Sequence, residues 1–262
     1  MRPNHVKQKL SADGTSIGTF VFEFSTTGIG RIVAEAGAAF AAFDMEHTGW
    51  SVETIRMLVA TTRSTELLPY VRIPATEYHF VARVLDMGAM GIMIPMVESA
   101  EQAARIVAAA KYPPVGRRGA AFCIAHDDYT NGDIVPKITS ANRETHLLAQ
   151  IETAAGVENA HAIAAVDGID VLWIGHFDLS NSLGIPGEFN HPRFQDALNT
   201  VLAACHAHGK IPGFMASSVE DGRALLDRGF RMLAYSGDLW LYQKAVRDGI
   251  AALNAHNPSP VN

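Results

Sequence analysis

Short runs of apolar residues alternate along this chain with amphipathic segments that have helical spacing. Residues 171–175 form one such apolar run, and residues 147–151 form another of the same kind. A run that is apolar at nearly every position is typical of a strand with both faces buried, as in a parallel sheet. The pattern predicts strands at residues 17–22, 39–43, 67–71, 91–95, 147–151, 171–175, 211–215 and 231–235.

The segments between these runs predict helices at residues 26–36, 52–62, 76–86, 98–110, 156–165, 192–208, 219–228 and 238–254. Residues 1–14 predict a short helix or arm, and the tail at 255–262, with two prolines, is expected to fray. Residues 115–145 interrupt the alternation. A long irregular segment inside a compact domain is usually functional or a lid, so we expect one of these roles here.

Regular alternation of strand and helix over 262 residues predicts one α/β domain, a (β/α)8 TIM barrel that spans residues 1–262. An open doubly wound sheet is the alternative. No Gly-x-Gly-x-x-Gly turn follows the first strand, which weakens a dinucleotide-binding interpretation. In barrels of this kind the active site lies at the carboxyl ends of the strands, so the polar residues there are the first candidates for function.

Composition narrows the function classes. The net charge of −6 and the lack of a basic block argue against nucleic acid as the main partner. The two cysteines, Cys123 and Cys205, offer no disulfide framework, and a reducing cytoplasm fits them. The polar start of the chain predicts no signal peptide, and no apolar run is long enough to span a membrane.

Polar side chains gather at the carboxyl ends of the predicted strands, and these are Asp44, His47, Arg72, Gln150, Glu152 and Asp178. Two neighbouring strands that each end in an acid would place Glu152 and Asp178 side by side, as a hard divalent cation requires. The alternative is that Asp178 caps the following helix and Glu152 lies in a first helical turn. Gln150 and Glu152 are two apart on one strand, so they face the same side.

Two carboxylates suit Mg²⁺ or Mn²⁺ and leave positions open for a substrate such as a 2-keto acid. A metal held there would stabilise an enolate as a Lewis acid. Arg72 offers a planar fork of donors to the same enolate, although a surface salt bridge is its alternative role. His47 could move a proton near neutral pH. Asp44 could orient His47, anchor water around the metal, or cap the helix at 52–62.

A Schiff-base aldolase uses the same barrel but needs a lysine at the carboxyl end of a strand. The lysines are Lys7, Lys9, Lys111, Lys137, Lys210 and Lys244, and the pattern places none of them there. His126, Asp127 and Asp128 are expected to form a solvated loop rather than a second metal site.

The sequence resembles the HpcH/HpaI aldolase family, the metal-dependent class II pyruvate aldolases, over about residues 15–250. The stretches that carry the resemblance are 43–47 (Phe-Asp-Met-Glu-His), 71–74 (Val-Arg-Ile-Pro), 85–88 (Leu-Asp-Met-Gly), 94–97 (Ile-Pro-Met-Val), 112–119 (Tyr-Pro-Pro with Gly116, Arg118 and Gly119), 150–153 (Gln-Ile-Glu-Thr) and 174–180 (Ile-Gly, then Asp-Leu-Ser). Together these stretches are specific, whereas each alone is weak.

The resemblance implies roles for individual residues. His47 would be the acid/base, Arg72 would stabilise the enolate, and Glu152 and Asp178 would hold Mg²⁺, Mn²⁺ or Co²⁺. It implies that Gln150, Gly175 and the backbone at Phe177 contact the keto acid and that Asp86 supports the base. It also implies a homohexamer, or trimer of dimers, in which the last helix packs on a neighbouring subunit.

Three positions depart from the family pattern. His176 and Phe177 stand where members often have proline and a small residue, and Met45 stands where many have glycine. The metal ligands are intact, so we predict a lyase that splits a 4-hydroxy-2-keto acid into pyruvate, or a close analogue, and an aldehyde. Phe177 would narrow the aldehyde pocket. The alternatives are a CoA-thioester lyase of the citrate-lyase β type and a barrel that binds a keto acid without turnover.

Overall fold

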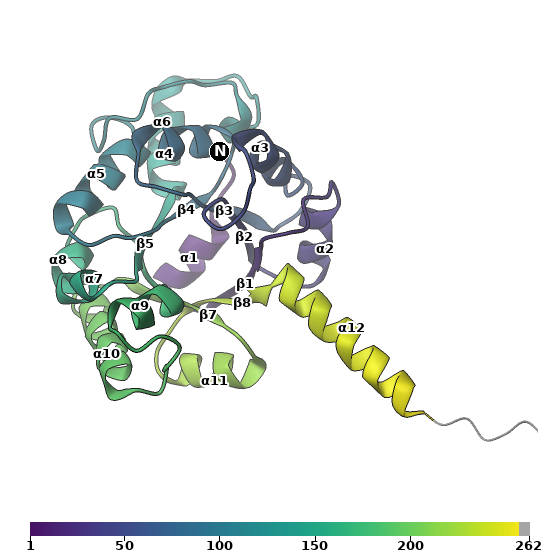
Figure 1. Cartoon of the computed structure of the whole chain (residues 1–262). Helices are drawn as coiled ribbons and strands as arrows, with labels where there is room; N and C mark the ends of the chain where they lie inside the picture. The colour runs from purple at the N-terminus through teal and green to yellow at the C-terminus, as the bar shows by residue number, and fades with distance from the viewer. Residues whose placement is uncertain (257–262) are drawn as a thin grey trace, which may run out of the picture.

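Eight parallel strands close into a barrel in chain order in the computed structural model, which describes residues 1–256. The strands are β1 (Ser16–Val21), β2 (Phe40–Asp44), β3 (Leu68–Arg72), β4 (Gly91–Ile94), β5 (His146–Ile151), β6 (Val171–Ile174), β7 (Ile211–Ala216) and β8 (Met232–Gly237). Strand β8 pairs in parallel with β1 and completes the ring, around which the helices lie (Figure 1). The predicted (β/α)8 barrel is confirmed.

Helices follow the strands as the sequence pattern predicts. They are α1 (His5–Ser11), α2 (Ile29–Glu35), α3 (Val52–Ala60), α4 (Tyr78–Asp86), α5 (Ala100–Ala110), η1 (Ala125–Asp127), α6 (Ile134–Glu144), α7 (Ala154–Glu158), α8 (Ala160–Ala164), α9 (His176–Ser182), α10 (Pro192–Ala207), α11 (Val219–Asp227) and α12 (Asp238–Ala255). None of them is long and apolar enough to cross a membrane, as far as residues 1–256 show.

Both faces of the strands are buried, which explains their nearly continuous apolar sequences. Alternate residues belong to two separate packed clusters. In β2, Phe40 and Ala42 pack inside the barrel, whereas Ala41 and Phe43 pack outward against the helices. Strand β6 repeats the pattern, with Trp173 inside. The same alternation decides which polar residues face inward at the strand ends.

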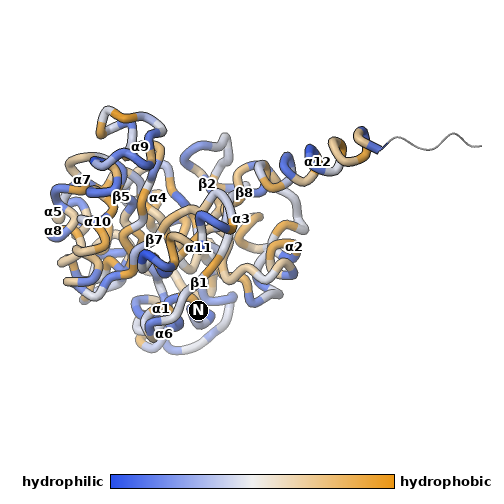
Figure 2. Tube along the Cα trace, turned by 90° about the horizontal axis from the view of Figure 1, so that it is seen from below, coloured by the Kyte–Doolittle hydropathy of each residue, from blue (hydrophilic) through white to orange (hydrophobic). Residues whose placement is uncertain are grey.

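Helix α1 closes the amino end of the barrel. Its buried residues Val6 and Leu10 belong to the inner cluster together with residues from the strands. Figure 2 shows α1 and α6 at one end of the molecule and α9 at the other. The arm predicted over residues 1–14 is therefore the floor of the barrel, and the opposite end is left open.

The segment 115–145 is not a lid over the open end, as its length suggested. It contains η1 and the 11-residue helix α6, and it lies on the floor side of the barrel. Asn142 at the end of α6 accepts from the Tyr112 N–H through Oδ1 at 2.7 Å, and Lys111 Nζ donates to its carbonyl. The segment is thus an addition to the packed floor.

Other differences from the sequence prediction are local. The helix expected at 156–165 is divided at Asn159 into α7 and α8. Strand β6 leads directly into α9, where a loop was expected. Helix α12 extends to Ala255, and residues 257–262 of the tail that was expected to fray lie outside the described residues.

His126 and Asp127 do not form the solvated loop that the sequence suggested. Their residues are 4% and 2% exposed. The Asp127 carboxylate accepts from Lys137 at 2.6 Å and from the Cys123 N–H at 2.8 Å. These bonds pair Asp127 Oδ2 within the packed floor, whereas Asp127 Oδ1 has no hydrogen-bond partner among the described atoms.

Candidate active site

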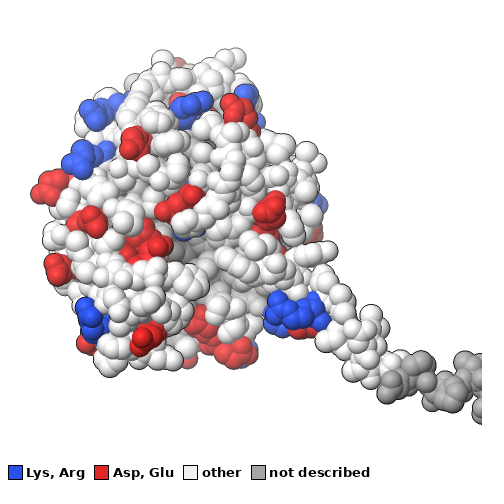
Figure 3. All heavy atoms as spheres, viewed as in Figure 1, with Lys and Arg blue, Asp and Glu red and all other residues white. Residues whose placement is uncertain are grey.

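A cavity of about 790 Å³ opens at the carboxyl end of the barrel. In Figure 3 it is the hollow at the centre of the molecule, with acidic side chains gathered beside it. Its walls contain most of the predicted site residues, including His47, Arg72, Gln150, Gly175 and Asp178. We call this space the mouth cavity. Its position agrees with the rule that barrel active sites lie at the carboxyl ends of the strands.

The inward alternation of the strands explains why polar side chains meet at the mouth. Residues 40 and 42 of β2 point inward, so the next inward position is Asp44. In β3 the inward residues Leu68 and Tyr70 are followed by Arg72. In β5 the inward residue Leu148 is followed two positions later by Gln150. The inward apolar residues deeper in the barrel therefore determine which side chains at the strand ends face the mouth.

Arg72 is 8% exposed and is held by two carboxylates. Its Nε donates to Asp44 Oδ1 at 2.6 Å, and its Nη1 lies 3.2 Å from Glu46 Oε2. The guanidinium also lies over the ring of Phe20, 5.2 Å from the ring centre. These contacts fix the plane of the guanidinium, and because it lines the mouth cavity, its other N–H groups are positioned for an anion.

Asp44 serves the turn that carries His47. The completely buried carboxylate accepts from the backbone N–H of His47 at 2.9 Å and of Glu46 at 3.2 Å. It does not cap the helix at 52–60, because Ser51 does so through a bond to the Thr54 N–H. Asp44 therefore positions His47 through its backbone, and it orients Arg72 directly.

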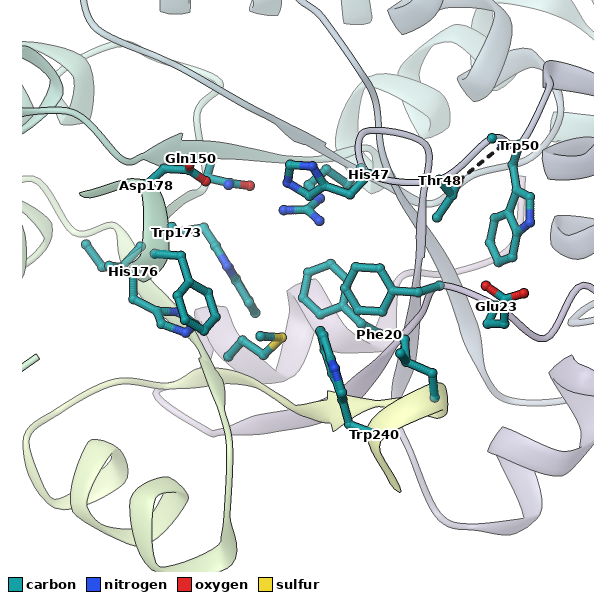
Figure 4. A pocket seen from close by; sticks show the side chains of 18 residues that line it. Phe20, Glu23, His47, Thr48, Trp50, Gln150, Trp173, His176, Asp178 and Trp240 are labelled. Carbon is teal, nitrogen blue, oxygen red and sulfur yellow. Dashed lines mark hydrogen bonds between the residues drawn. The ribbon is translucent and has the colours of Figure 1, made fainter. Parts of the chain in front are cut away.

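His47 lies at the entrance of the mouth cavity. Its side chain is 55% exposed, and its Nε2 is 3.6 Å from Glu46 Oε2. Figure 4 shows its ring between Gln150 on one side and Thr48 and Trp50 on the other. An imidazole in this position can exchange protons with solvent and with a bound molecule.

Glu46 is a site residue that the sequence argument did not select. Burial raises the pKa of its carboxyl to about 7 against the attraction of Arg72, and Asp44 and Asp178 raise it further. Its Oε2 is buried without a hydrogen-bond partner among the described atoms. The only sequence signal was its place in the Asp-Met-Glu-His stretch, beside the two residues that were selected.

Glu152 lies directly beneath the wall of the cavity and is 1% exposed. Its Oε1 accepts from the Met96 N–H at 2.6 Å, and its Oε2 accepts from the amide of Gln150. Burial raises the pKa of this carboxyl to about 7, the two hydrogen bonds oppose the rise, and Glu46 and Asp178 add to it. Three acids therefore converge here with Arg72 as the nearby cation.

Gly175 leaves room for Glu152. A Cβ at this position would lie 2.3 Å from Glu152 Oε2 and 2.8 Å from Gln150 Nε2, so even alanine would collide. Asp178 lies in the first turn of α9 but makes no capping bond, since Gly175 is the N-cap residue. Glu152, by contrast, lies outside a helix, because it precedes Thr153, the N-cap residue of α7. The capping alternatives for both acids are wrong.

His176 packs among aromatic rings. Its ring stacks on Phe214 with centres 5.1 Å apart, and the rings of Phe177 and Phe189 lie at 4.4 and 5.2 Å. Burial lowers the pKa of His176 to about 4 against the attraction of Asp221 and Asp178. The imidazole is thus neutral at pH 7 and forms part of an apolar wall, next to the 57% exposed Phe177.

Asp86 is not brought to His47 within the chain. It ends α4, accepts from Arg118 Nη2 at 2.5 Å, and lines a separate depression with Arg56 and Tyr129. Within one chain Asp86 thus lies away from the mouth cavity, and its support of the base stays a prediction from the family resemblance.

The lysines also lie away from the cavity, whose described lining residues include none. Lys111 donates from the floor to the carbonyls of Asn142 and Thr145 at 2.6 and 2.9 Å. A Schiff-base mechanism has no nucleophile here.

Comparison with protein families matches residues 18–245 to the family described as HpcH/HpaI aldolase/citrate lyase. The chain belongs to this family. A 5-keto-4-deoxy-D-glucarate aldolase of Klebsiella pneumoniae is 32% identical over 94% of both chains. The crystal structure of an HpcH/HpaI aldolase from Desulfitobacterium hafniense has a TM-score of 0.92 and 35% identity, covering 97% of this chain and 99% of that one.

A family protein of Burkholderia cenocepacia is also similar, with a TM-score of 0.90 and 29% identity over 96% of this chain and 100% of the other. These relatives confirm the resemblance seen in the sequence motifs and the prediction of a carbon–carbon lyase of the aldolase type. They act on small molecules according to their names.

The acids at the mouth fit a divalent cation. Glu152 and Asp178 are oxygen donors of the kind that Mg²⁺ and Mn²⁺ prefer. Gln150 Oε1 is a buried atom without a hydrogen-bond partner among the described residues, and Glu46 Oε2 makes an ion pair with Arg72 but no hydrogen bond, so both oxygens can serve a ligand or ion. No cluster of three His, Cys, Asp or Glu residues of metal-binding shape occurs in residues 1–256.

Proposed function

We propose that the protein is a divalent-metal-dependent aldolase that splits a 4-hydroxy-2-keto acid into pyruvate, or a close analogue, and an aldehyde. The observation that carries the proposal is the meeting of Arg72 with the acids Glu46, Glu152 and Asp178 at one mouth cavity. Bound there, Mg²⁺, Mn²⁺ or Co²⁺ would be held by Glu152 and Asp178 and would polarise the keto group as a Lewis acid.

The chain's own groups account for the rest of the reaction. In cleavage, the C4 hydroxyl loses its proton, the C3–C4 bond breaks, and its electron pair forms the enolate of pyruvate while the C4 carbonyl forms. His47 is placed at the entrance to accept the hydroxyl proton. Protonation of the enolate at C3 then gives pyruvate.

Arg72 is placed to stabilise the negative charge of the enolate oxygen, because Asp44 and Glu46 hold its guanidinium in a fixed plane. Gln150 Oε1 has no partner among the described atoms and lines the cavity, so it can accept from a bound substrate or from water. Gly175 lets the substrate approach close to Glu152.

The experiment measures pyruvate release from a panel of 4-hydroxy-2-keto acids and from oxaloacetate, whose decarboxylation forms the same enolate. It compares Mg²⁺ or Mn²⁺ with EDTA, and the wild type with Glu152→Ala. Release that requires both metal and Glu152 supports the proposal. Release that survives EDTA refutes the metal role.

Glu152→Gln is the matched variant, because it can keep the bond from the Met96 N–H while removing the charge. We expect it to lose Mn²⁺ binding, measured by calorimetry without substrate, and to unfold at no lower temperature than the wild type. Tight Mn²⁺ binding by this variant would contradict the assignment of the ligand.

A CoA-thioester lyase is the second enzymatic candidate. CoA phosphates need several basic groups, and Arg72 is the one Lys or Arg in the described lining of the cavity. A barrel that binds without turnover is the remaining alternative, and a lack of release from every substrate would favour one of these two.

The chain is also proposed to form a homo-oligomer through α12, a hexamer by family resemblance. This helix has no buried residue and extends away from the barrel (Figure 1). Tyr242, Val246 and Ile250 are exposed at a spacing of one helical turn, so they form an apolar stripe. Light scattering of Val246→Asp should show smaller particles than the wild type, and an unchanged mass would contradict this.

The cytoplasm is the compartment we propose. Both cysteines are free, one exposed and one buried. Thiols remain reduced in the cytoplasm. Fractionation of the source cells would test this, and recovery outside the cytoplasm would refute it.

A further inference from the structure

Four aromatic rings form a continuous wall from the bottom of the mouth cavity to its rim. Trp173 lies edge-on to Phe20 with centres 6.0 Å apart, and Phe20 stacks on Phe22 at 5.3 Å. Phe22 in turn meets Trp240 at 5.0 Å. Trp173 is 2% exposed and Trp240 is 42% exposed, so the wall runs from the buried end to solvent. Figure 4 shows Trp173, Phe20 and Trp240 among the residues around the cavity.

This aromatic wall is held in place by the start of α12. The carboxylate of Asp238 accepts from the backbone N–H groups of Phe22, Glu23 and Phe24 at 2.9, 3.0 and 2.7 Å. These bonds join the loop that carries Phe22 to the helix that carries Trp240. The rings are therefore arranged before any ligand arrives, which lowers the entropy loss on binding.

Gly237 is required for the contact between the two outer rings. A Cβ on Gly237 would lie 2.8 Å from Phe22 and 3.0 Å from Trp240. Both distances are shorter than carbon atoms tolerate, so a side chain here would separate the rings. The backbone is thus fitted to this aromatic pair.

Charge on the cavity wall has an unfavourable sign for a second carboxylate. Besides Asp178, whose charge the proposed metal would neutralise, the described lining contains the acid Glu23 and one Lys or Arg side chain, Arg72. Arg72 is already paired with Asp44 and Glu46. A substrate whose aldehyde half carries a carboxylate would meet an acidic side chain or aromatic rings in place of a basic group, and either contact disfavours it.

From these observations we infer that the aldehyde half of the substrate is uncharged and carries a flat apolar group, such as an aromatic ring. The inference rests on the proposed aldolase function and names its substrate class. A 4-deoxy-ketoglucarate is a dicarboxylate, so the inference also separates this chain from the relative in Klebsiella pneumoniae. The Phe177 and His176 rings supply a further apolar surface on the same cavity.

The experiment measures cleavage of three adducts of pyruvate, formed with benzaldehyde, glycolaldehyde and succinate semialdehyde, at saturating Mn²⁺. We expect kcat/KM for the benzaldehyde adduct to exceed that for each of the others by about tenfold or more. Equal values, or a preference for the carboxylated adduct, would overturn the inference.

Trp240→Ala tests the wall directly. We expect the preference for the benzaldehyde adduct to fall about tenfold. Gly237→Ala should lower the same preference without removing an aromatic ring. Val135→Ala is the matched control, because it removes an exposed apolar side chain from α6, on the floor side and outside the described lining of the cavity. A preference that is the same in all of these proteins would overturn the inference.

Exchange of the pyruvate methyl protons in D₂O separates the two levels of the argument, because it reports enolate formation without an aldehyde. If the methyl protons exchange but the benzaldehyde adduct is not preferred, only the inference is refuted. Absence of exchange and of all cleavage refutes the proposed function, and the inference with it.

Discussion

The two ends of the barrel both bury charged and polar side chains, but they satisfy them differently. At the floor, Lys7 pairs with Asp170 at 2.8 Å, and Tyr70 Oη lies 2.7 Å from His146 Nδ1. Glu144 there accepts from the Asn4 N–H at 2.7 Å. At the mouth, buried oxygens of Glu46 and Gln150 have no hydrogen-bond partner among the described atoms. These floor pairs are formed within the chain, whereas the mouth presents its polar groups to a cavity.

The pKa shifts follow the same division. At the floor, the pKa of Glu144 is lowered, because the Asn4 N–H and Arg143 outweigh the effect of burial. At the mouth, burial raises the pKa of Glu46 and of Glu152 to about 7. Ionisation of a glutamate therefore stabilises the fold at the floor and destabilises it at the mouth. A carboxyl whose pKa the fold lowers is typical of a structural contact, and a carboxyl whose pKa the fold raises is typical of a functional site.

The largest effect is expected at the mouth, from Arg72→Lys. Lysine keeps the positive charge but lacks the fork that binds Asp44 Oδ1 while presenting further N–H groups to the cavity. We expect kcat for pyruvate release to fall about 10²- to 10³-fold, as for the loss of an oxyanion donor. Steady-state kinetics with a circular-dichroism melt distinguish this from unfolding. An unchanged kcat would show that Arg72 only supports the structure.

The next largest effect is expected at the floor, where folding stability should depend on pH. Burial lowers the pKa of His146 to about 4, so the folded state holds a neutral ring that can accept from Tyr70 Oη. The unfolded value is about 6.5, so folding stability from this group is complete above that pH. It is lost as the pH falls from about 6.5 toward 4, by an amount on the order of 3 kcal/mol.

Urea titrations at several pH values measure this loss. The variant His146→Gln removes the titrating ring, so its stability should depend less steeply on pH between 6.5 and 4.5 than that of the wild type. The difference between the two proteins isolates His146 from His176, whose pKa is also lowered to about 4. Parallel curves would show that the floor does not exclude the charged imidazole.

The sequence was sufficient for the barrel but only for part of the site, and the reasons are physical. Each strand is an apolar run with both faces buried, so the run itself reveals the strand. Asp44, Arg72 and Gln150 were found because they end such runs. Glu46 was missed because its burial comes from a turn, which Asp44 holds by hydrogen bonds to the backbone.

Helix α6 was missed for a related reason. Its apolar face is weak, and its buried residues are only Ala141 and Glu144. Its position depends on long-range bonds such as that of Glu144 to Asn4, which no local pattern reveals. Asp86 is a different case, because only the family resemblance named it, and one chain alone does not bring it to the cavity.

The smallest effects are expected when glutamate is replaced by glutamine once at each end of the barrel. The free energy of unfolding is measured in EDTA at pH 8. The pKa of Glu46 in the folded protein lies above its unfolded value, so ionisation destabilises the fold as the pH rises from about 4.5 to 7. Glu46→Gln should therefore raise the free energy of unfolding by about 1 kcal/mol.

The pKa of Glu144 lies below its unfolded value, so its stabilisation is complete above about pH 4.5. Glu144→Gln should lower the free energy of unfolding by about 1 kcal/mol. Shifts of the same sign would contradict the difference between an acid that the floor stabilises and an acid that the mouth destabilises.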